Sequence, residues 1–285
     1  MKLAAAPISW GVSEVPGWGL QLAPDRVLAE MHALGMAATE AGPPGFLPDD
    51  AAAARALLAR HGLSLVGGFV TAVLHDPVRR AVELASVDRQ AAWLAAGGAE
   101  ILVLAAATGR AGYAETDEIG DAGWRELFAS LDEADAIARR HGLALAVHPH
   151  YGTVIETAAQ VERLLEGCAH GLCLDTGHVA LGGADPVRIA EIAGARLRHV
   201  HLKDVHPDLA PRVRERRIDY AAGVRAGLYV QLGKGTARIA AVLGHLREAG
   251  YRGWYVLEQD VMLDRVPAGP PEHVQRSVNF VRRHV

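Results

Sequence analysis

The chain has 285 residues, of which 50% are hydrophobic and 22% are charged, so it is long and apolar enough to bury a large core. Its formal net charge is −4, and its densest basic run, residues 211–217, is interrupted by Glu215. We interpret that run as a solvated face and expect neither a nucleic-acid partner nor a polybasic membrane anchor. No apolar run approaches the ~18 residues of a transmembrane helix, and the N-terminus lacks the long apolar region of a signal peptide, so we expect a cytoplasmic protein with no membrane contact.

Short apolar runs that are typical of strands recur along the whole chain and alternate with longer segments of helical periodicity. In chain order these runs predict strands over residues 2–9, 37–42, 63–69, 100–106, 143–149, 171–177, 197–204 and 254–260. The clearest helical segments between them cover residues 23–35, 51–62, 132–142 and 239–250. Each of these four segments ends in glycine, a common helix terminator, shortly before the next strand.

Strands and helices that alternate in this way indicate βαβ units and a parallel sheet. About eight repeats in a chain of this length predict an α/β fold, a (β/α)8 TIM barrel formed as one domain over residues 1–285. A doubly wound open sheet is the alternative. It is less favoured because no dinucleotide-binding glycine pattern follows the first strand.

Polar side chains gather at the carboxyl ends of the predicted strands, where barrel enzymes build their sites. The set comprises Glu40, His148, His150, Asp175, His178, His201, Lys203, Glu258 and Asp260. In a barrel these positions converge on one mouth, and chain-distant His, Asp and Glu side chains that converge there can form a metal site with nitrogen and oxygen ligands.

Each candidate also has an ordinary structural interpretation. Asp175 could cap the next helix, and His148 could be a hydrogen-bonded core histidine. Glu258 follows an apolar run and needs a partner, either a metal or a basic side chain. We expect a structural role for His199. Trp10 follows the first strand and could either pack in the core or form a wall against a polyol ring.

Three motifs resemble those of the xylose-isomerase-like barrel superfamily of sugar isomerases, epimerases and dehydratases: "LDTGH", "RHVHLKD" and "GWYVLEQD". Further stretches resemble the myo-inosose dehydratase branch, namely "APISWG", "TEAGPPGFLP", "HPHYGTVIET", "GKGTARIAAVLGHLREAGYRGWYVLEQD" and "PAGPPEHVQRSVNFVR". The similarity runs nearly from end to end, and its carboxyl-terminal half is the more specific part.

The resemblance implies a divalent metal held by side chains from strands five to eight. Asp175, His201 and Glu258 match three of the ligands, and His148 stands where isomerases and epimerases usually have glutamate. His148 is therefore either a fourth ligand or a group that faces the substrate. Two carboxylates and two imidazoles suit Mn²⁺, Co²⁺ or Zn²⁺, and the resemblance favours manganese or cobalt. His178 matches a position beside the metal or substrate.

The activity implied is dehydration of an inosose, 2-keto-myo-inositol, by removal of an α-proton and loss of a β-hydroxyl in inositol catabolism. Lys203 could stabilise the enolate, act as an acid or base, or simply pair with Glu258 or Asp260. Glu40 could be a base, orient a hydroxyl or cap a helix, and His150 and His178 are further acid–base candidates. We expect Trp10, His148 and Asp260 to contact substrate.

Three other functions make different demands on these residues. A ketose isomerase or epimerase would use the same metal without a departing hydroxyl. A DNA-repair endonuclease on this barrel would need more metal ligands and a basic surface, and the net charge of −4 disfavours it. A catalytically inactive sugar-binding protein would not need the ligand set. The expected partner is a small polyol or keto-sugar, and a homo-oligomer is possible.

Overall fold

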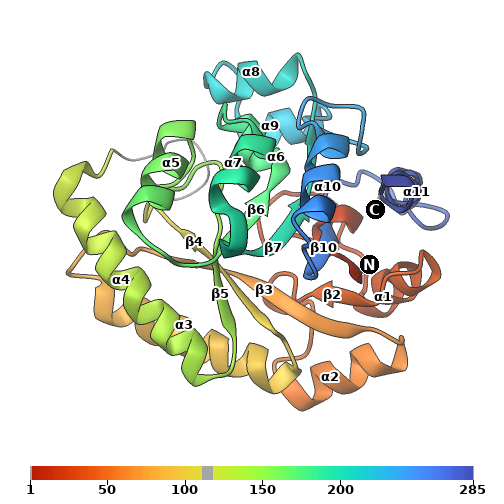
Figure 1. The fold of residues 1–285 in the computed structure, drawn as a ribbon. Helices are drawn as coiled ribbons and strands as arrows, with labels where there is room; N and C mark the ends of the chain where they lie inside the picture. The colour runs from red at the N-terminus through yellow and green to blue at the C-terminus, as the bar shows by residue number, and fades with distance from the viewer. Residues whose placement is uncertain (1, 111–117, 285) are drawn as a thin grey trace.

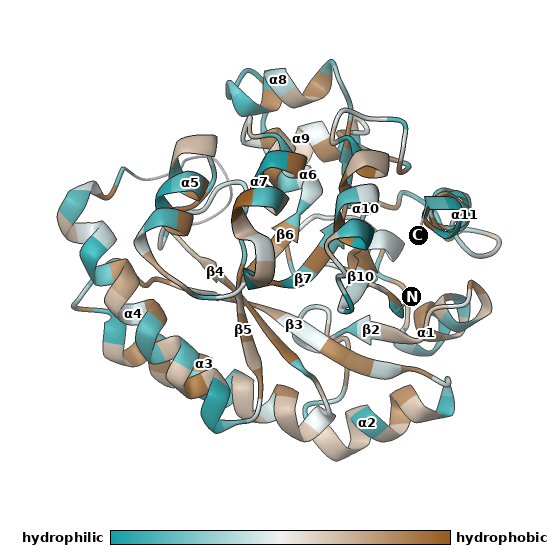
Figure 2. Cartoon of the chain, in the orientation of Figure 1, coloured by the Kyte–Doolittle hydropathy of each residue, from teal (hydrophilic) through white to brown (hydrophobic). Residues whose placement is uncertain are grey.

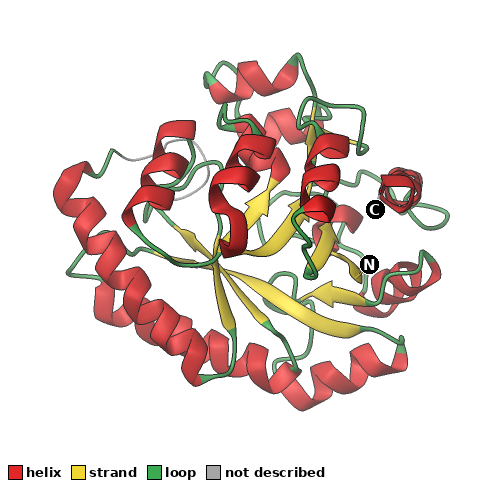
Figure 3. Cartoon of the chain, in the orientation of Figure 1, coloured by secondary structure: helices red, strands yellow, loops and turns green. Residues whose placement is uncertain are grey.

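The predicted strands close into one parallel barrel (Figures 1 and 3). The computed structural model describes residues 2–110 and 118–284. Within them, the strand order around the barrel is β1-β10-β7-β6-β5-β4-β3-β2. The barrel strands are β1 (Lys2–Ala5), β2 (Ala38–Glu40), β3 (Ser64–Ala72), β4 (Ile101–Ala106), β5 (Ala144–Val147), β6 (Leu172–Asp175), β7 (Leu197–Leu202) and β10 (Trp254–Leu257). The (β/α)8 prediction is confirmed.

Helices surround the barrel and cover the outer faces of its strands (Figure 3). The longer ones are α1 (Pro24–Ala33), α2 (Ala51–Arg60), α3 (Arg80–Gly97), α4 (Gly120–Arg140), α5 (Ala158–Gly167), α7 (Pro186–Ala193), α10 (Ile239–Glu248) and α11 (Glu272–His284). Shorter ones are η1 (Pro7–Trp10), α6 (Thr176–Leu181), η2 (Gly194–Arg196), α8 (Leu209–Arg214) and α9 (Tyr220–Arg225). No helix of the described chain is both long enough and apolar enough to cross a membrane.

Many predicted boundaries differ from the structure by a few residues, among them the ends of the first and last strands and the start of the helix before β5. The first strand stops at Ala5 because Pro7, which has no N–H for the sheet, begins η1. The predicted helix over 132–142 is the second half of α4, which begins at Gly120. The last strand ends at Leu257, so Glu258 and Asp260 lie just beyond it.

The apolar residues fill the space between the strands and the helices. Figure 2 shows mostly hydrophobic colours along β3 and mixed colours along α4, as expected for an inner strand and an amphipathic outer helix. Four fully or almost fully buried residues from neighbouring strands pack inside the barrel: Ile101, Val103, Ala146 and Cys173. The barrel is therefore a packed core, and its polar residues are confined to one end.

A small excursion interrupts the pattern after β7. Strand β8 (Asp204–Val205) pairs with β9 (Tyr229–Val230) in an antiparallel two-stranded sheet, and helices α8 and α9 lie between them at one end of the barrel (Figure 1). The buried Asp204 carboxylate accepts the backbone N–H groups of Gly233, Gly235 and Ala237, each at 2.9 Å. Asp204, the last residue of the "RHVHLKD" motif, therefore holds the glycine-containing loop over residues 233–237 in place.

Candidate active site

The register of the strands brings donors that are far apart in the chain to the same end of the barrel. Asp175 and His201 are direct partners on β6 and β7. On the other side of β7, Val256 of β10 pairs with His201, which brings the chain that continues to Glu258 alongside it. His148 immediately follows β5. Side chains from four adjacent strands can therefore meet.

Four donor atoms from these strands do meet. His148 Nε2 lies 3.2 Å from His201 Nδ1 and 3.7 Å from Asp175 Oδ2. His201 Nδ1 lies 3.5 Å from Asp175 Oδ2 and 2.9 Å from Glu258 Oε2. Atoms that bind one ion at about 2.1 Å are themselves roughly 3.0–3.4 Å apart, so these separations have the scale of a coordination shell. The donor set of two imidazoles and two carboxylates fits a divalent transition metal.

The hydrogen bonds of Asp175 support the same interpretation. One oxygen, Oδ1, caps α6 by accepting the His178 N–H at 2.8 Å. The other, Oδ2, is fully buried and accepts no hydrogen bond from the described residues, although three nitrogen atoms lie 3.5–3.7 Å away. The predicted capping role is therefore present, and it leaves the second oxygen available as a ligand.

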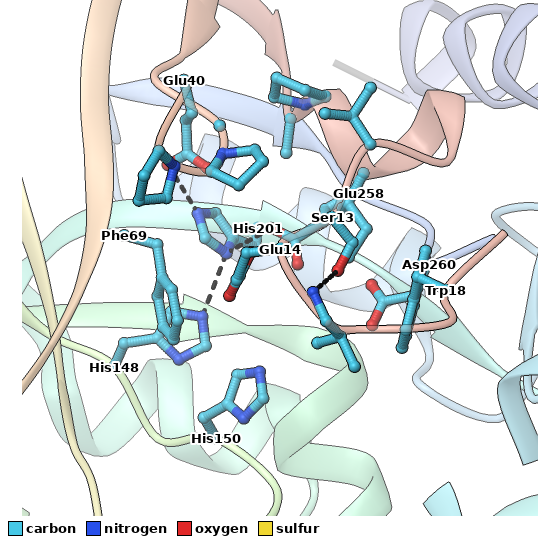
Figure 4. A pocket seen from close by; sticks show the side chains of 18 of the residues that line it. Ser13, Glu14, Trp18, Glu40, Phe69, His148, His150, His201, Glu258 and Asp260 are labelled. Carbon is cyan, nitrogen blue, oxygen red and sulfur yellow. Dashed lines mark hydrogen bonds and ion pairs between the residues drawn. The ribbon is translucent and has the colours of Figure 1, made fainter. Parts of the chain in front are cut away.

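Glu40 sets the orientation of the His201 ring. Its Oε1 lies 2.9 Å from the Nε2 atoms of both His201 and His199 (Figure 4 shows the bond to His201). A carboxylate can only accept, so His201 carries a proton on Nε2 and presents Nδ1 to the donor cluster, as metal-binding histidines usually do. Burial opposes ionisation of Glu40, but His201 and His199 together lower its pKa to about 2.

Three groups of possible ligands lie together in the described part of the chain: one, Asp175 with His178 and Glu258, shares two of the donors above, and the other two are less suited to a metal. Cys173 lies near His148 and His201, but burial raises the pKa of this thiol to about 11, which disfavours the thiolate that a metal needs. Glu40, His199 and His201 also lie together, but their hydrogen bonds already engage the Glu40 oxygen that faces both rings. His148 Nδ1, by contrast, has no hydrogen-bond partner among the described residues.

Lys203 is fully buried in a slot formed by the "DTGH" turn. The Thr176 hydroxyl accepts the Lys203 N–H at 2.9 Å and donates to the Lys203 carbonyl at 2.7 Å. A Cβ at Gly177 would overlap the Lys203 side chain, so the absence of a side chain at this position makes the slot. The "LDTGH" and "RHVHLKD" motifs therefore contact each other through both backbone and side-chain atoms.

The Lys203 ammonium ends among carboxylates. It forms an ion pair with Glu258 Oε1 and lies 2.8 Å from Asp260 Oδ1, 3.6 Å from Asp175 Oδ2 and 3.1 Å from His178 Nε2. Burial alone would lower the pKa of Lys203, but Asp260, Glu258 and Asp175 raise it well above its usual value. The ammonium is therefore a permanent charge, and it leaves Glu258 Oε2 for His201 and the donor cluster.

A cavity of about 810 Å³, continuous with solvent, opens onto these groups (Figure 4). One part of its lining is titratable and includes Glu14, Glu40, His148, His150, His201, Glu258 and Asp260. Another part is apolar or aromatic and includes Ile8, Val12, Val15, Trp18, Phe69 and Tyr220. A ring with hydroxyl groups at its rim and C–H bonds on its faces matches such a mixed lining.

Burial keeps the two histidines that follow β5 neutral. Desolvation, aided by the neighbouring His201, lowers the pKa of His148 to about 3. Desolvation and the Lys203 charge lower the pKa of His150 to about 4. Burial has the opposite effect on Asp260 and raises the pKa of its carboxyl despite the adjacent Lys203 ammonium. The cavity therefore presents neutral imidazoles and a carboxyl group that retains its proton more readily than usual.

The predicted residues occupy three places. Glu40, His148, His150, His201, Glu258 and Asp260 line the cavity, whereas Asp175, His178 and Lys203 lie behind its wall. Trp10 is in neither group: its side chain is fully buried in the main core, its Nε1 donates to Glu30 Oε2 at 2.9 Å, and it does not line the cavity. Of the two interpretations of Trp10, packing in the core is the one that describes its position.

Several cavity residues were missed from the sequence. Trp18, Phe69 and Tyr220 line the cavity from a loop, the middle of β3 and the start of α9, where no strand-end rule points. The basic run was also misread at one position. Arg216 is partly buried and forms a two-pronged ion pair with the buried Glu156, and no sequence pattern announced that partner.

The sequence model of the family described as "Xylose isomerase-like TIM barrel" matches residues 28–284. The chain belongs to the xylose isomerase-like TIM barrel family. A protein named inosose dehydratase from Geobacillus kaustophilus is 31% identical over 296 residues, which cover 100% of this chain and 94% of the relative. The rhizopine catabolism protein MocC of Rhizobium meliloti is 30% identical over 91% of this chain and 82% of its own length.

Solved structures share the fold of this xylose isomerase-like barrel at lower identity. The D-allulose 3-epimerase from Methylomonas sp., in complex with D-allulose, has a TM-score of 0.72 at 16% identity over 100% of this chain and 97% of its own. The 3-keto-D-glucoside 4-epimerase from E. coli has a TM-score of 0.70 at 18% identity, with 99% of each chain covered.

The first prediction for this xylose isomerase-like barrel concerns Asp175. The variant Asp175→Asn keeps a carbonyl oxygen to cap the His178 N–H but removes the charge of the uncapped oxygen. Loss of groups that merely orient ligands costs roughly 10- to 100-fold in metal affinity, so we expect Mn²⁺ or Co²⁺ affinity, measured by titration calorimetry, to fall by about 100-fold or more. Asp185→Asn, at a residue that caps α7 in the same way, is the control. Equal affinity of the two variants would contradict the site.

The second prediction concerns acid stability. The pKa of His150 is about 4 in the fold against 6.5 in the unfolded chain, so the unfolded state binds the proton first. Stability is therefore full above pH 6.5 and declines as pH falls towards 4. In metal-free protein, His150→Asn should reduce the slope of the unfolding free energy against pH in that window by up to about 1.4 kcal/mol per pH unit. The exposed His32→Asn is the control for urea titrations at several pH values, and parallel curves for His150→Asn and wild type would refute the prediction.

Proposed function

We propose that the protein is a metal-dependent hydro-lyase that dehydrates an inosose such as 2-keto-myo-inositol. The observation that carries the proposal is the convergence of two imidazoles and two carboxylates at a cavity that also holds neutral histidines and a carboxyl group of raised pKa. Relatives named inosose dehydratase, which align over 94–97% of their own length, support the substrate class.

The metal would be held by His148, Asp175, His201 and Glu258. A bound divalent ion supplies Lewis acidity that makes the proton next to a substrate ketone easier to remove. We favour manganese or cobalt over zinc because the sequence resemblance favours them. Lys203 and Glu40 act through the ligands: Lys203 holds one oxygen of Glu258, and Glu40 fixes the tautomer of His201.

His150 is proposed as the base. Its Nδ1 lies 2.7 Å from the Tyr151 carbonyl oxygen, which can only accept, so Nδ1 carries the proton and Nε2 keeps a lone pair. The lowered pKa of His150, about 4, keeps the ring neutral at pH 7 and therefore able to take a proton. His178, whose ring centroid lies 3.8 Å from that of His150, supports this ring and is the second acid–base candidate.

Asp260 is proposed as the acid that protonates the departing hydroxyl. It lines the cavity, and its raised pKa favours the protonated form. In the overall step His150 takes the α-proton, the C–H electron pair forms the carbon–carbon double bond, the β C–O bond breaks, and the hydroxyl leaves as water with the Asp260 proton. The substrate is one neutral small molecule, and the cytoplasmic location expected from the sequence remains a prediction.

A ketose epimerase of the same family is the alternative that the assay must separate. Epimerisation at one carbon needs a base on each face of the substrate and no departing hydroxyl. The histidine at position 148, in place of a carboxylate, is the feature of this chain that favours dehydration. The same enzyme preparation should therefore be offered ketohexoses beside inososes.

The proposal predicts metal-dependent formation of a conjugated hydroxy-enone. Protein stripped with a chelator should be inactive on 2-keto-myo-inositol, and added Mn²⁺ or Co²⁺ should restore an ultraviolet absorbance increase from the conjugated product. Glu258→Gln should abolish that increase, because it removes a ligand charge. Restored ketose epimerisation without dehydration would replace the proposal with its alternative, and no metal-dependent turnover of either substrate would refute both.

A further inference from the structure

The excursion over residues 206–230 packs on the barrel through a buried hydrophobic cluster, and an ion pair with a buried carboxylate adds to these contacts. Arg216 Nη1 and Nη2 donate to Glu156 Oε1 and Oε2 at 2.7 and 2.8 Å. The Glu156 side chain is only 1% exposed and also accepts the Gly152 N–H at 2.7 Å. A two-pronged pair on a desolvated carboxylate is strong and geometrically specific. We call this Arg216–Glu156 pair the clasp.

Arg216 directly follows the C-terminus of α8. Its φ of +54° is the left-handed conformation of an ordinary helix C-terminal turn, in which the Arg216 N–H donates to the Val213 carbonyl at 2.9 Å and the Arg217 N–H donates to the Arg212 carbonyl at 2.8 Å. Another ion pair between the excursion and the rest of the chain, Arg225 with Asp264 at 3.4 Å, joins side chains that are 52% and 85% exposed, and its strength is correspondingly low.

Aromatic contacts connect the clasp to the cavity. The Arg216 guanidinium lies 4.7 Å from the centre of the Tyr151 ring, and the Tyr151 hydroxyl donates to the Val213 carbonyl at 2.9 Å. Tyr151 in turn stacks on Tyr220, with ring centroids 5.0 Å apart and planes inclined by 16°. One face of Tyr220 therefore packs against a barrel residue, Tyr151, that the Arg216 guanidinium also contacts.

The hydroxyl of Tyr220 reaches the chemistry directly. Its oxygen lies 2.8 Å from Asp260 Oδ2, and Lys203 Nζ lies 2.8 Å from Oδ1 of the same carboxyl group. Tyr220 is also one of the residues that line the cavity. Asp260 is thus gripped at both oxygens, by an ammonium from the barrel and by a phenol from the excursion.

We propose that Tyr220 is a catalytic residue that contacts the substrate and fixes the Asp260 carboxyl, and that Arg216 is a positioning residue that holds Tyr220 in place through Tyr151. This inference rests on the proposed function, because it assigns to the excursion the acid side of the same cavity. Tyr220, the residue of the excursion that lines the cavity, then limits which ring substrates can lie against Asp260.

The first experiment tests Tyr220. Loss of a hydrogen bond to a carboxyl group predicts a roughly 10- to 100-fold fall in kcat/KM on 2-keto-myo-inositol for Tyr220→Phe. Tyr255→Phe, at a buried tyrosine that packs on Tyr251 away from the cavity, should stay within about twofold. If Tyr220 acts through Asp260, the double variant Tyr220→Phe/Asp260→Asn should lose no more than Asp260→Asn alone. Additive losses, or an unchanged Tyr220→Phe, would overturn the assignment.

The second experiment tests the clasp. In Arg216→Met, hydrogen exchange followed by mass spectrometry should show faster exchange across residues 209–225, and KM should rise by about five- to tenfold with kcat and Mn²⁺ affinity nearly unchanged. Arg216→Lys, which keeps the charge but not the fork, should recover part of the protection. Arg225→Met is the matched control and should leave both readouts as in wild type. Identical exchange in Arg216→Met and Arg225→Met would overturn the clasp.

The two proposals fail in different ways. Active wild-type protein with an unaffected Tyr220→Phe variant refutes the tyrosine assignment and leaves the dehydratase proposal standing. Wild-type protein that is inactive on inososes refutes the proposed function, and the tyrosine assignment falls with it. The exchange comparison of Arg216→Met with Arg225→Met needs no turnover and decides the clasp in either case.

Discussion

The rest of the site depends on the buried ammonium of Lys203. Its side chain passes over Gly177, its backbone is held by Thr176, and its charge lies against the carboxyl groups of Glu258, Asp260 and Asp175. An unpaired ammonium in this position would be prohibitively costly, and so would the unpaired carboxylates. Each therefore fixes the other, and Glu258 and Asp175 are left with one oxygen each directed at the two histidines.

Charge balance explains why the arrangement calls for a divalent cation. Three carboxylates, those of Glu40, Asp175 and Glu258, lie beside the histidines of the donor cluster, and the Lys203 ammonium balances one of them. In the metal-free site the remaining negative charge is partly met at His201, whose pKa the Glu40 and Glu258 carboxylates raise well above normal despite burial. Exchange of the His201 Nδ1 proton for a divalent ion would bring the cluster closer to neutrality.

Much of this could be predicted from the sequence, because strand ends in a parallel barrel all point to one mouth. Asp175 and His201 lie opposite each other in register, so two motifs some 25 residues apart had to meet once the fold was correct. The burial of the Lys203 side chain could not be predicted, since it depends on which side chain fills the space above Gly177. Tyr220 and Arg216 escaped prediction because they reach the site through stacking and an ion pair with Glu156, which follow no sequence period. Trp10 illustrates the opposite case. It follows the first strand, so its position in the sequence allows contact with the cavity, but its side chain points into the core.

The most direct test of the account is the position of the metal. Crystals of the protein grown with Mn²⁺ should give, in data collected at the manganese absorption edge, one strong anomalous peak bounded by His148 Nε2, Asp175 Oδ2, His201 Nδ1 and Glu258 Oε2. The four donor atoms should each lie at about 2.0–2.3 Å from it. Absence of a peak at that point, or a peak held instead by Cys173 or by Glu40 and His199, would contradict the account.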